Sequence, residues 1–482
     1  MNRKIVFNIT GKFLQSLSLL LLLPMIVSLI YKEHSFMAFL VTSIISFAAG
    51  FTITLFSSDC KKELYAREGF LIVALAWVSA SLVGCLPFII SGEVTSFVDA
   101  FFETVSGFTT TGASVLNPEK LSHGILFWRS LTHWIGGMGV LVFIVAFAGN
   151  LSDRAIHILR AEMPGPVVGK IVPRAKDTSK VLYIMYIILT VAQIIFLWCG
   201  EMDLFESIVH SLGTAGTGGF GIKGDSLAGY SAYSQWVITA FMLIFGINFN
   251  LYYLLTIKRF KAVFKSVELW TYISMVIICS LLIAVNVRGL FPSFGETIRQ
   301  SVFQVSSIIT TTGYATADFN LWPQFSRSII FVLLFTGACA GSTTGGLKLS
   351  RVIILFKMGI RETKRLVHPR SIGSVKFEGK DVDETTQNSI AKYFAVYMMC
   401  IFVIFILLSA GPETFGFETS FTAAVTCFNN VGPGFDLIGP MGSFNVFSDY
   451  SKILLSFCML LGRLEIFPIL IAIIPSTWKN YN

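Results

Sequence analysis

Ten apolar segments of this chain are long enough to cross the hydrocarbon core of a membrane. That core is about 30 Å thick and a helix rises about 1.5 Å per residue, so one crossing needs roughly 20 apolar residues. With 54 % hydrophobic and only 13 % charged residues, the chain has too little polar surface for a water-soluble globule. It is predicted to be an all-α polytopic membrane protein. The segments lie at residues 9–31, 36–57, 69–91, 125–149, 181–200, 234–256, 268–288, 327–356, 390–410 and 451–474.

The basic residues indicate the orientation in the membrane. They gather in four stretches, at 61–67, 154–180, 258–265 and 357–392. Lysine and arginine are enriched in cytoplasmic loops, so these stretches and, with an even number of spans, both termini are predicted to be cytoplasmic. The net charge of +8 is spread over these loops and does not predict a nucleic-acid partner. The N-terminal apolar run lacks a small-residue cleavage site and is interpreted as a spanning helix.

Four shorter apolar runs lie on the predicted outer side, at 98–109, 203–215, 296–310 and 415–428. Each is too short to span, and a chain that enters the membrane and returns is tolerated only where it is buried in protein or lines a water-filled cavity. The pattern predicts an initial two-helix pair and then four repeats of helix, re-entrant pore helix and helix around a pseudo-fourfold pore. The predicted divisions are the pair at 1–60 and repeats at 61–160, 161–260, 261–370 and 371–482.

A polar turn with a glycine follows each short run. The segments FETVSGFTTTGAS, VHSLGTAGTGGFG, FQVSSIITTTGYA and TAAVTCFNNVGPG align without gaps and superpose Gly112, Gly219, Gly313 and Gly432. Glycine lets an extended backbone bend so that its carbonyl oxygens replace the water around a cation. These glycines are therefore predicted to form a selectivity filter. The residues before them that would present carbonyls are Thr110, Thr111, Thr217, Gly218, Thr311, Thr312, Asn430 and Val431.

Acidic residues lie at or near the starts of the four short helices. A carboxylate there either caps the helix or raises the local cation concentration, and both interpretations are open. If the opposite, carboxyl ends of these helices point at the axis, their dipoles also favour a cation. The acidic residues are Asp99, Glu103, Asp203, Glu206, Glu296 and Glu418.

Below the turns, the third inner span is interrupted by TGACAGSTTGGLK at residues 336–348. Its four glycines disfavour a regular helix. Three consecutive hydroxyl residues among them favour a movable loop across the permeation path over close helix packing through small residues. The residues predicted to gate are Gly341, Ser342, Thr343, Thr344, Gly345 and Gly346.

Arg463 and Glu465 lie inside the last predicted span. A charge at the bilayer centre costs roughly 2.5 to 3.5 kcal/mol on insertion scales, so it usually faces a cavity or a partner. Arg463 is predicted to be a positive plug below the filter, with an ion pair to Glu465 or another carboxylate as the alternative. His133 in the first inner span is expected to be a packing histidine with its hydrogen bonds satisfied.

Together these motifs resemble the Trk-type potassium uptake proteins of the Trk/Ktr/HKT superfamily, close to the bacterial TrkH and TrkG branch. The segments that carry the resemblance are TTTGAS, TGGF, TTTGYAT, GCLPF, RAEMPGP, ACAGSTTGGLK, RLVHPR, FNNVGPGF and GRLEIFP.

The resemblance implies potassium uptake across the inner (cytoplasmic) membrane of a bacterium, with potassium as the permeant ion and no bound organic cofactor. It implies a homodimer of pores in membrane lipid and a cytoplasmic TrkA-type regulatory subunit that binds ATP, ADP or NAD. It also implies filter roles for the four aligned glycines, a gating role for residues 336–348 and a place beneath the filter for Arg463.

Two of the turns depart from a uniform pattern, at Gly218 and at Asn430 with Val431. A sodium-permeant or ion-coupled cation carrier on the same fold is therefore the alternative. An intramembrane enzyme would need paired carboxylates, a metal-ligand cluster or a nucleophile with a base. The sequence offers only Asp436 in GPGFD, without a partner at a matching position, so the chain is predicted not to be an enzyme. It contains no nucleotide-binding loop of the Gly-Lys-Ser type, so any nucleotide dependence is expected from a partner.

Overall fold

The computed structural model describes residues 2–57, 65–139, 175–370 and 373–478 of the 482-residue chain. The described part is mostly helical and includes one hairpin, in which β1 (Lys376–Phe377) pairs antiparallel with β2 (Lys380–Asp381). Six helical segments of this part are long and apolar enough to cross a membrane, which supports the predicted class of polytopic helical membrane protein. They are Arg3–Ile30, Ser35–Phe56, Arg67–Ile90, Lys180–Trp198, Val267–Asn286 and Glu384–Ser409.

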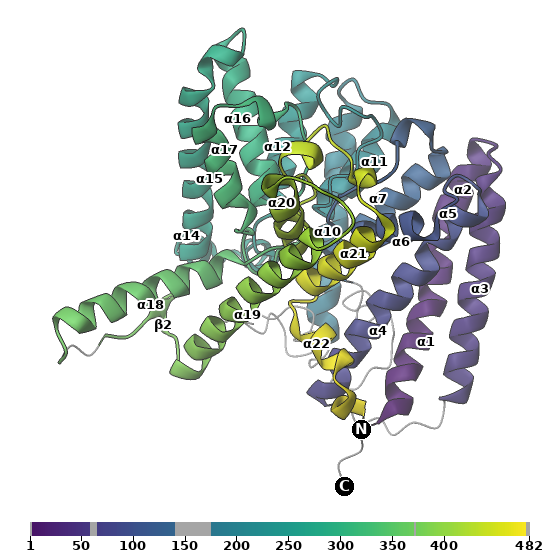
Figure 1. Ribbon diagram of the computed structural model, residues 1–482, viewed down its shortest axis with the longest axis horizontal. Coiled ribbons are helices and arrows are strands. Elements are labelled where there is room, and N and C mark those ends of the chain that lie inside the picture. The colour runs from purple at the N-terminus through teal and green to yellow at the C-terminus, as the bar shows by residue number, and fades with distance from the viewer. Residues whose placement is uncertain (1, 58–64, 140–174, 371–372, 479–482) are drawn as a thin grey trace.

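The chain begins with two antiparallel crossings at one edge of the molecule (Figure 1). Helices α1 (Arg3–Leu20) and α2 (Leu22–Ile30) make the first crossing and α3 (Ser35–Phe56) makes the second. Gly11 and Gly50 allow the close approach, since a Cβ on Gly11 would lie 2.8 Å from the carbonyl oxygen of Gly50.

After this pair, the described helices form four groups, each with a long helix of 19 to 26 residues, a shorter helix of 12 to 16 residues and two or more further helices. The elements of the four groups are α4 (Ala66–Gly84), α5 (Leu86–Ile90), α6 (Phe97–Phe108) and α7 (His123–Gly137); α10 (Ala175–Trp198), α11 (Leu204–Ala215), α12 (Ala232–Phe245) and α13 (Phe249–Thr256); α14 (Phe260–Phe264), α15 (Val267–Asn286), α16 (Phe294–Ile309), α17 (Gln324–Leu334) and α18 (Leu349–Val367); and α19 (Glu384–Ser409), α20 (Phe417–Asn429), α21 (Asp449–Arg463) and α22 (Phe467–Ile473). Short 3-10 turns lie at Pro118–Lys120, Arg288–Leu290, Phe319–Leu321, Asp436–Ile438, Phe444–Val446 and Pro475–Trp478.

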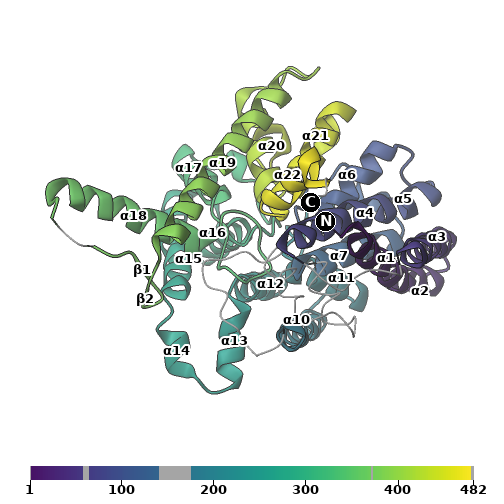
Figure 2. The ribbon, with the colours of Figure 1, turned by 90° about the horizontal axis from the view of Figure 1, so that it is seen from below.

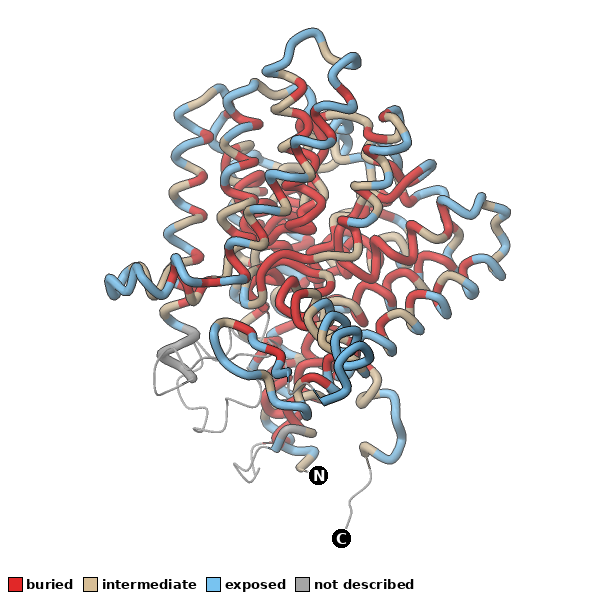
Figure 3. Tube along the Cα trace, turned by 90° about the vertical axis from the view of Figure 1, so that its left-hand side faces the viewer, coloured by how far each residue is buried: buried red, intermediate tan, exposed pale blue. Residues whose placement is uncertain are grey.

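The short helices α6, α11, α16 and α20 lie around a common centre when the molecule is seen from below (Figure 2). Buried residues concentrate in this centre, whereas the outer faces of the long helices are exposed (Figure 3). Large apolar side chains cover those outer faces, for example Ile44 and Phe51 on α3 and Ile406 on α19. An apolar exterior of this kind suits a lipid environment rather than water.

Several inner segments are broken where the sequence pattern predicts continuous spans. The predicted span 234–256 bends by 88° between α12 and α13. The predicted span 451–474 breaks between α21 and α22, where Glu465 and Ile466 have φ of 52° and 71°. The break between α17 and α18 is the one that the sequence predicts.

Inner helices pack closely against neighbouring segments near these breaks. A Cβ on Gly462, at the end of α21, would lie less than 3.0 Å from the carbonyl oxygen of Phe428 on α20. Gly246, at the end of α12, approaches the Thr310 methyl group and the Tyr272 hydroxyl group in the same way. The first inner helix, α7, ends at Gly137, and the rest of the predicted span 125–149 falls largely outside the described residues, as does the RAEMPGP motif.

Both ends of the described chain lie on the same side of the molecule (Figure 1). The Arg3 guanidinium group donates a hydrogen bond to the carbonyl oxygen of Trp478, and the Arg67 guanidinium group donates one to the carbonyl oxygen of Thr477. The basic loops predict that this side is cytoplasmic.

Candidate functional site

The four predicted turns meet at the centre of the molecule and form a closed ring. A Cβ on each aligned glycine would lie less than 3.0 Å from a carbonyl oxygen of the next turn, so only glycine fits these positions. The glycines also have positive φ, between 75° and 98°, which L side chains rarely adopt. The pairs, in order around the ring, are Gly112 with Gly218 O, Gly219 with Thr312 O, Gly313 with Val431 O and Gly432 with Thr111 O.

The residue two positions before each glycine is also left-handed. This conformation costs a non-glycine residue roughly 1 to 2 kcal/mol and is a genuine outlier for β-branched threonine. Such strain persists where the surrounding structure imposes it and clusters at functional sites. The sequence analysis assigned the unusual dihedrals to glycine alone, although these residues align in all four turns. They are Thr110 (φ 56°), Thr217 (φ 54°), Thr311 (φ 53°) and Asn430 (φ 55°).

The strained residues close the same helix-ending motif four times. In each turn, the residue before the glycine donates its amide hydrogen to the carbonyl oxygen five residues back, as in a Schellman motif. The carboxyl ends of α6, α11, α16 and α20 are thereby fixed at the ring, where their dipoles place partial negative charge. The bonds are Thr111 to Ser106 (2.9 Å), Gly218 to Gly213 (2.9 Å), Thr312 to Ser307 (2.8 Å) and Val431 to Thr426 (3.0 Å).

Most of the acidic residues near the helix starts form ion pairs. Only Asp203 acts as a cap among the six, by accepting a hydrogen bond from the Glu206 amide group at 2.6 Å. Ser96 and Ser293 cap α6 and α16. The ion pairs are Asp99 with Lys452, Glu103 with Arg129, Glu206 with Lys223, Glu296 with Arg299 and Glu418 with Arg327.

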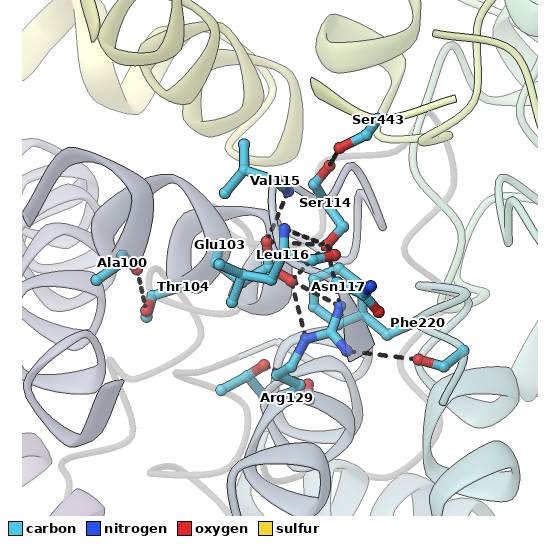
Figure 4. Close-up of polar contacts among 12 residues, drawn as sticks. Ala100, Glu103, Thr104, Ser114, Val115, Leu116, Asn117, Arg129, Phe220 and Ser443 are labelled. Carbon is cyan, nitrogen blue, oxygen red and sulfur yellow. Dashed lines mark hydrogen bonds and ion pairs between the residues drawn. The ribbon is translucent and has the colours of Figure 1, made fainter. Parts of the chain in front are cut away.

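Glu103 and Arg129 form a buried ion pair behind the first turn (Figure 4). Their side chains are 0 % and 3 % exposed, and Arg129 Nε donates to Glu103 Oε1 at 2.8 Å. The Ser114 hydroxyl group bridges the two charges, because it donates to Glu103 Oε1 at 2.9 Å and accepts from Arg129 Nη2 at 3.1 Å. Arg129 also reaches the second turn, where it donates to Gly221 O at 3.4 Å and covers the Phe220 ring.

This network was not predicted from the sequence. The arginine inside the predicted span 125–149 was the sequence feature that could have indicated it, because a charge at that depth needs a partner. The network also reaches the last group of helices, since the Ser114 carbonyl oxygen accepts hydrogen bonds from the Ser443 hydroxyl group (3.2 Å) and the Phe444 amide group (3.0 Å).

The predicted gating loop lies directly beneath the ring. The Gly345 amide group donates to Thr311 Oγ1 at 2.7 Å, and a Cβ on Gly345 would lie 2.6 Å from the Asn429 carbonyl oxygen. Thr343 is fully buried and its hydroxyl group donates to Phe245 O at 3.4 Å, at the end of α12. The loop therefore fills the space between two turns of the ring and the break in α12–α13.

Arg463 fastens this loop to the first inner helix. Its guanidinium group donates to Thr343 O at 3.0 Å, to Gly136 O at 2.5 Å and to Gly137 O at 2.9 Å. Glu465, the carboxylate suggested as its partner, forms an ion pair with Arg351 of α18. The charged residues of the last inner span thus connect three different segments below the ring.

Glu268 holds the loop from the other side. One carboxylate oxygen of this buried residue on α15 accepts hydrogen bonds from the amide group of Ala340 (2.8 Å), within the loop, and from that of Ser350 (3.1 Å), in the first turn of α18. The amide group of Glu268 in turn donates to Glu378, in the β1–β2 hairpin, at 3.1 Å. The sequence analysis missed this residue, although its charge marks the start of a predicted span.

His133 differs from its expectation. It is fully buried, but neither ring nitrogen has a hydrogen-bond partner among the described residues, so the expected satisfied histidine is wrong. Its ring packs against the second turn, stacked on Phe220 with the ring centroids 4.2 Å apart.

The fold and this central ring define a polytopic helical membrane protein with four closely packed glycine turns at its buried centre. A model of the TrkH family, described as a cation transport protein, matches residues 35–480. The chain belongs to this family, so the predicted resemblance is confirmed. The family comprises transport proteins, which agrees with the prediction that the chain is not an enzyme.

Similar proteins cover the chain over its full length. It is 36 % identical to the Trk system potassium uptake protein TrkH of Escherichia coli K12, over 100 % of both chains. It is 35 % identical to the Trk system potassium uptake protein TrkG of the same organism, over 99 % of both chains. The crystal structure of the potassium transporter TrkH from Vibrio parahaemolyticus matches with a TM-score of 0.89 and 32 % identity, covering 99 % of this chain and 100 % of that one.

Proposed function

We propose that this chain takes up potassium across the inner membrane of a bacterium through the ring of four turns. The relatives are named for potassium uptake, and the closed ring is the observation that carries the proposal to particular residues. In this proposal the four groups of helices are repeats at 61–160, 161–260, 261–370 and 371–482, after the pair at 1–60. The helices α6, α11, α16 and α20 are the re-entrant pore helices.

The turns supply the oxygen atoms that replace the hydration shell of the ion. The carbonyl groups of the residues before each glycine line the ring, and the ends of the four short helices add partial negative charge, so the site favours a cation. A glycine occupies the aligned position of all four turns, which favours potassium. We therefore infer a preference for potassium, with a sodium-permeant or ion-coupled carrier as the alternative because the second and fourth turns differ from the others.

The loop at 336–348 is the proposed gate. It lies under the ring, and Arg463 and Glu268 fasten it to neighbouring helices. Arg463 adds a positive charge beneath the proposed filter and opposes the passage of cations. Its release from Thr343 and from α7 would free the loop to move.

The proposal includes a homodimer in membrane lipid and a cytoplasmic TrkA-type subunit that binds nucleotide. The relatives are named as proteins of a Trk system, and this name supports partner subunits. In this proposal the subunit acts on the loop through the hairpin around Glu378, since Glu378 accepts a hydrogen bond from the amide group of Glu268 and Glu268 holds the loop.

The deciding experiment is rubidium uptake into liposomes that contain the purified protein, with potassium or sodium as competitor. We expect strong inhibition by potassium and weak inhibition by sodium. Equal inhibition by both ions would favour the sodium-permeant alternative. If no uptake occurs, addition of a TrkA-type subunit with nucleotide distinguishes a closed gate from a wrong function.

A further inference from the structure

The second turn of the ring lacks a side chain at a position where the other three turns carry a β-branched residue. Thr111, Thr312 and Val431 align with Gly218. Positive φ does not explain this glycine, because Gly218 is absent from the described residues with positive φ. The backbone at Gly218 would accept an ordinary side chain, so another part of the molecule must exclude it.

His133 occupies the space of the missing side chain. A Cβ on Gly218 would lie less than 3.0 Å from Cγ, Cδ2 and Nδ1 of the His133 ring. The ring is held between this turn and Phe220, on which it stacks with an interplanar angle of 25°. Since neither ring nitrogen has a hydrogen-bond partner in the described part of the chain, packing rather than hydrogen bonding fixes the ring.

The contact reaches the ring of carbonyl groups directly. The carbonyl oxygen of Gly218 faces Gly112, where it would meet a Cβ at less than 3.0 Å, so it belongs to the closed ring. Arg129, four residues before His133 on α7, covers the same Phe220 ring with its guanidinium carbon 4.1 Å from the centroid. Two side chains of one inner helix therefore support the second turn from behind.

We propose that His133 is a specificity-determining positioning residue. Its imidazole ring takes the place of the β-branched side chain of the other turns and holds the Gly218 carbonyl group in the ring, which sets the preference for potassium over sodium. This inference rests on the proposed potassium pathway. In this view, His133 on α7 compensates for the side chain that Gly218 lacks in the second turn.

The test combines His133→Ala and Gly218→Ser in one double-mutant cycle. Gly218→Ser alone forces a side chain into the His133 ring, and we expect rubidium uptake to fall roughly tenfold or more, because overpacking of a rigid core is costly. Removal of the ring by His133→Ala makes room for the serine, so the double variant is expected to recover most of the uptake. A double variant that loses as much uptake as Gly218→Ser alone would overturn the proposal.

The second readout is the ratio of potassium to sodium inhibition of rubidium uptake. His133→Ala alone is expected to retain uptake but to lower this ratio several-fold, since the Gly218 carbonyl group loses its support. His133→Phe keeps a packed ring without nitrogens and is expected to preserve the ratio. An unchanged ratio in His133→Ala, or an equal loss in His133→Phe and His133→Ala, would overturn the positioning role.

Leu131→Ala is the matched control, because Leu131 is buried two positions earlier on the same helix. It removes a buried side chain and is expected to leave the ion ratio unchanged. Gly313→Ser separates this inference from the proposed function. Persistent uptake in Gly313→Ser would reject the ring as the pathway, whereas lost uptake in Gly313→Ser with a normal ratio in His133→Ala would reject only the role of His133.

Discussion

The amide group of Gly345 donates a hydrogen bond of 2.7 Å to Oγ1 of Thr311. Gly345 belongs to the proposed gating loop, and Thr311 is the left-handed residue of the third turn, with φ of 53°. One bond therefore joins the gate to a strained position of the proposed filter. Because strained conformations persist only while their surroundings impose them, movement of the loop is expected to change the conformation of the ring as well.

Substitution of a ring glycine is expected to abolish uptake. In Gly313→Ser the new Cβ would lie less than 3.0 Å from the Val431 carbonyl oxygen, and the residue would have to keep a φ of 82°. The ring would have to deform, so rescue of growth in low potassium and rubidium uptake into liposomes should both be lost. Gly112→Ser is expected to behave in the same way, because a Cβ on Gly112 would lie less than 3.0 Å from the carbonyl oxygen of Gly218.

Gly289→Ser is the control for these variants. A Cβ at Gly289 meets nothing within 4 Å, so this variant should support normal growth and uptake. Unchanged rescue and ion preference in both Gly313→Ser and Gly112→Ser would count against the filter assignment.

Removal of the Arg463 side chain is expected to raise flux. Arg463→Ala eliminates a positive charge below the ring and breaks the hydrogen bonds to Thr343, Gly136 and Gly137. Both effects favour cation passage, and the measurement is the initial rate of rubidium uptake per purified protein. An unaltered or lower rate would reject the plug.

Arg463→Lys separates the two effects. Lysine keeps the charge but lacks the planar fork that reaches several carbonyl groups at once. If the charge alone limits flux, Arg463→Lys should remain near the original rate. If the fastening of the loop limits flux, Arg463→Lys should be nearly as active as Arg463→Ala.

Release of the loop at Glu268 is also expected to raise flux. Glu268→Ala removes the acceptor for the Ala340 and Ser350 amide groups, and two hydrogen bonds to a charged group are worth enough to change the open population by about tenfold or more. Glu268→Gln still offers a carbonyl oxygen to these donors and should stay closer to the original rate. The measurement is the open probability of single channels in planar bilayers.

Ile277→Ala, at an exposed position of the same helix α15, is the control for this series and should leave the open probability unchanged. A normal open probability in Glu268→Ala, together with a raised one in Arg463→Ala, would mean that the loop is held by Arg463 alone.

The sequence predicts much of this arrangement because membranes impose strong rules. Apolar length predicts the six described helices that are long enough to span, although it predicts ten spans in all, and the repeated turns predict that Gly112, Gly219, Gly313 and Gly432 occupy equivalent places. The glycine-rich stretch at 336–348 predicts the break between α17 and α18. Each of these inferences depends on a local pattern or on its repetition.

The parts that sequence reasoning missed depend on partners far away along the chain. The bend at Gly246 and the break after Gly462 occur where these inner helices touch the ends of α16 and α20. Charge within a span signals that Arg129 and Glu268 need partners, but it does not identify Glu103 or the loop amide groups as those partners. The left-handed conformation of the threonines recurs at one aligned position, and only the comparison of all four turns reveals this.

The buried pair of Glu103 and Arg129 is expected to determine the stability of the outer part of the ring. Removal of one member of a buried ion pair leaves an uncompensated charge and typically costs about 3 to 5 kcal/mol. Glu103→Leu and Arg129→Met should therefore each lower the midpoint of thermal unfolding of the purified protein in detergent. The double variant leaves no buried charge and should recover a large part of the loss.

The pair also positions the filter, and the ion preference distinguishes this role from stability alone. Arg129 reaches both Ser114, after the first turn, and Gly221, after the second. Neither leucine nor methionine can replace those hydrogen bonds, so the double variant should regain thermal stability while its ratio of potassium to sodium inhibition remains low. Recovery of both properties would show that the pair only fills and neutralises its site, whereas recovery of neither would mean that the Ser114 and Gly221 contacts also hold the fold together.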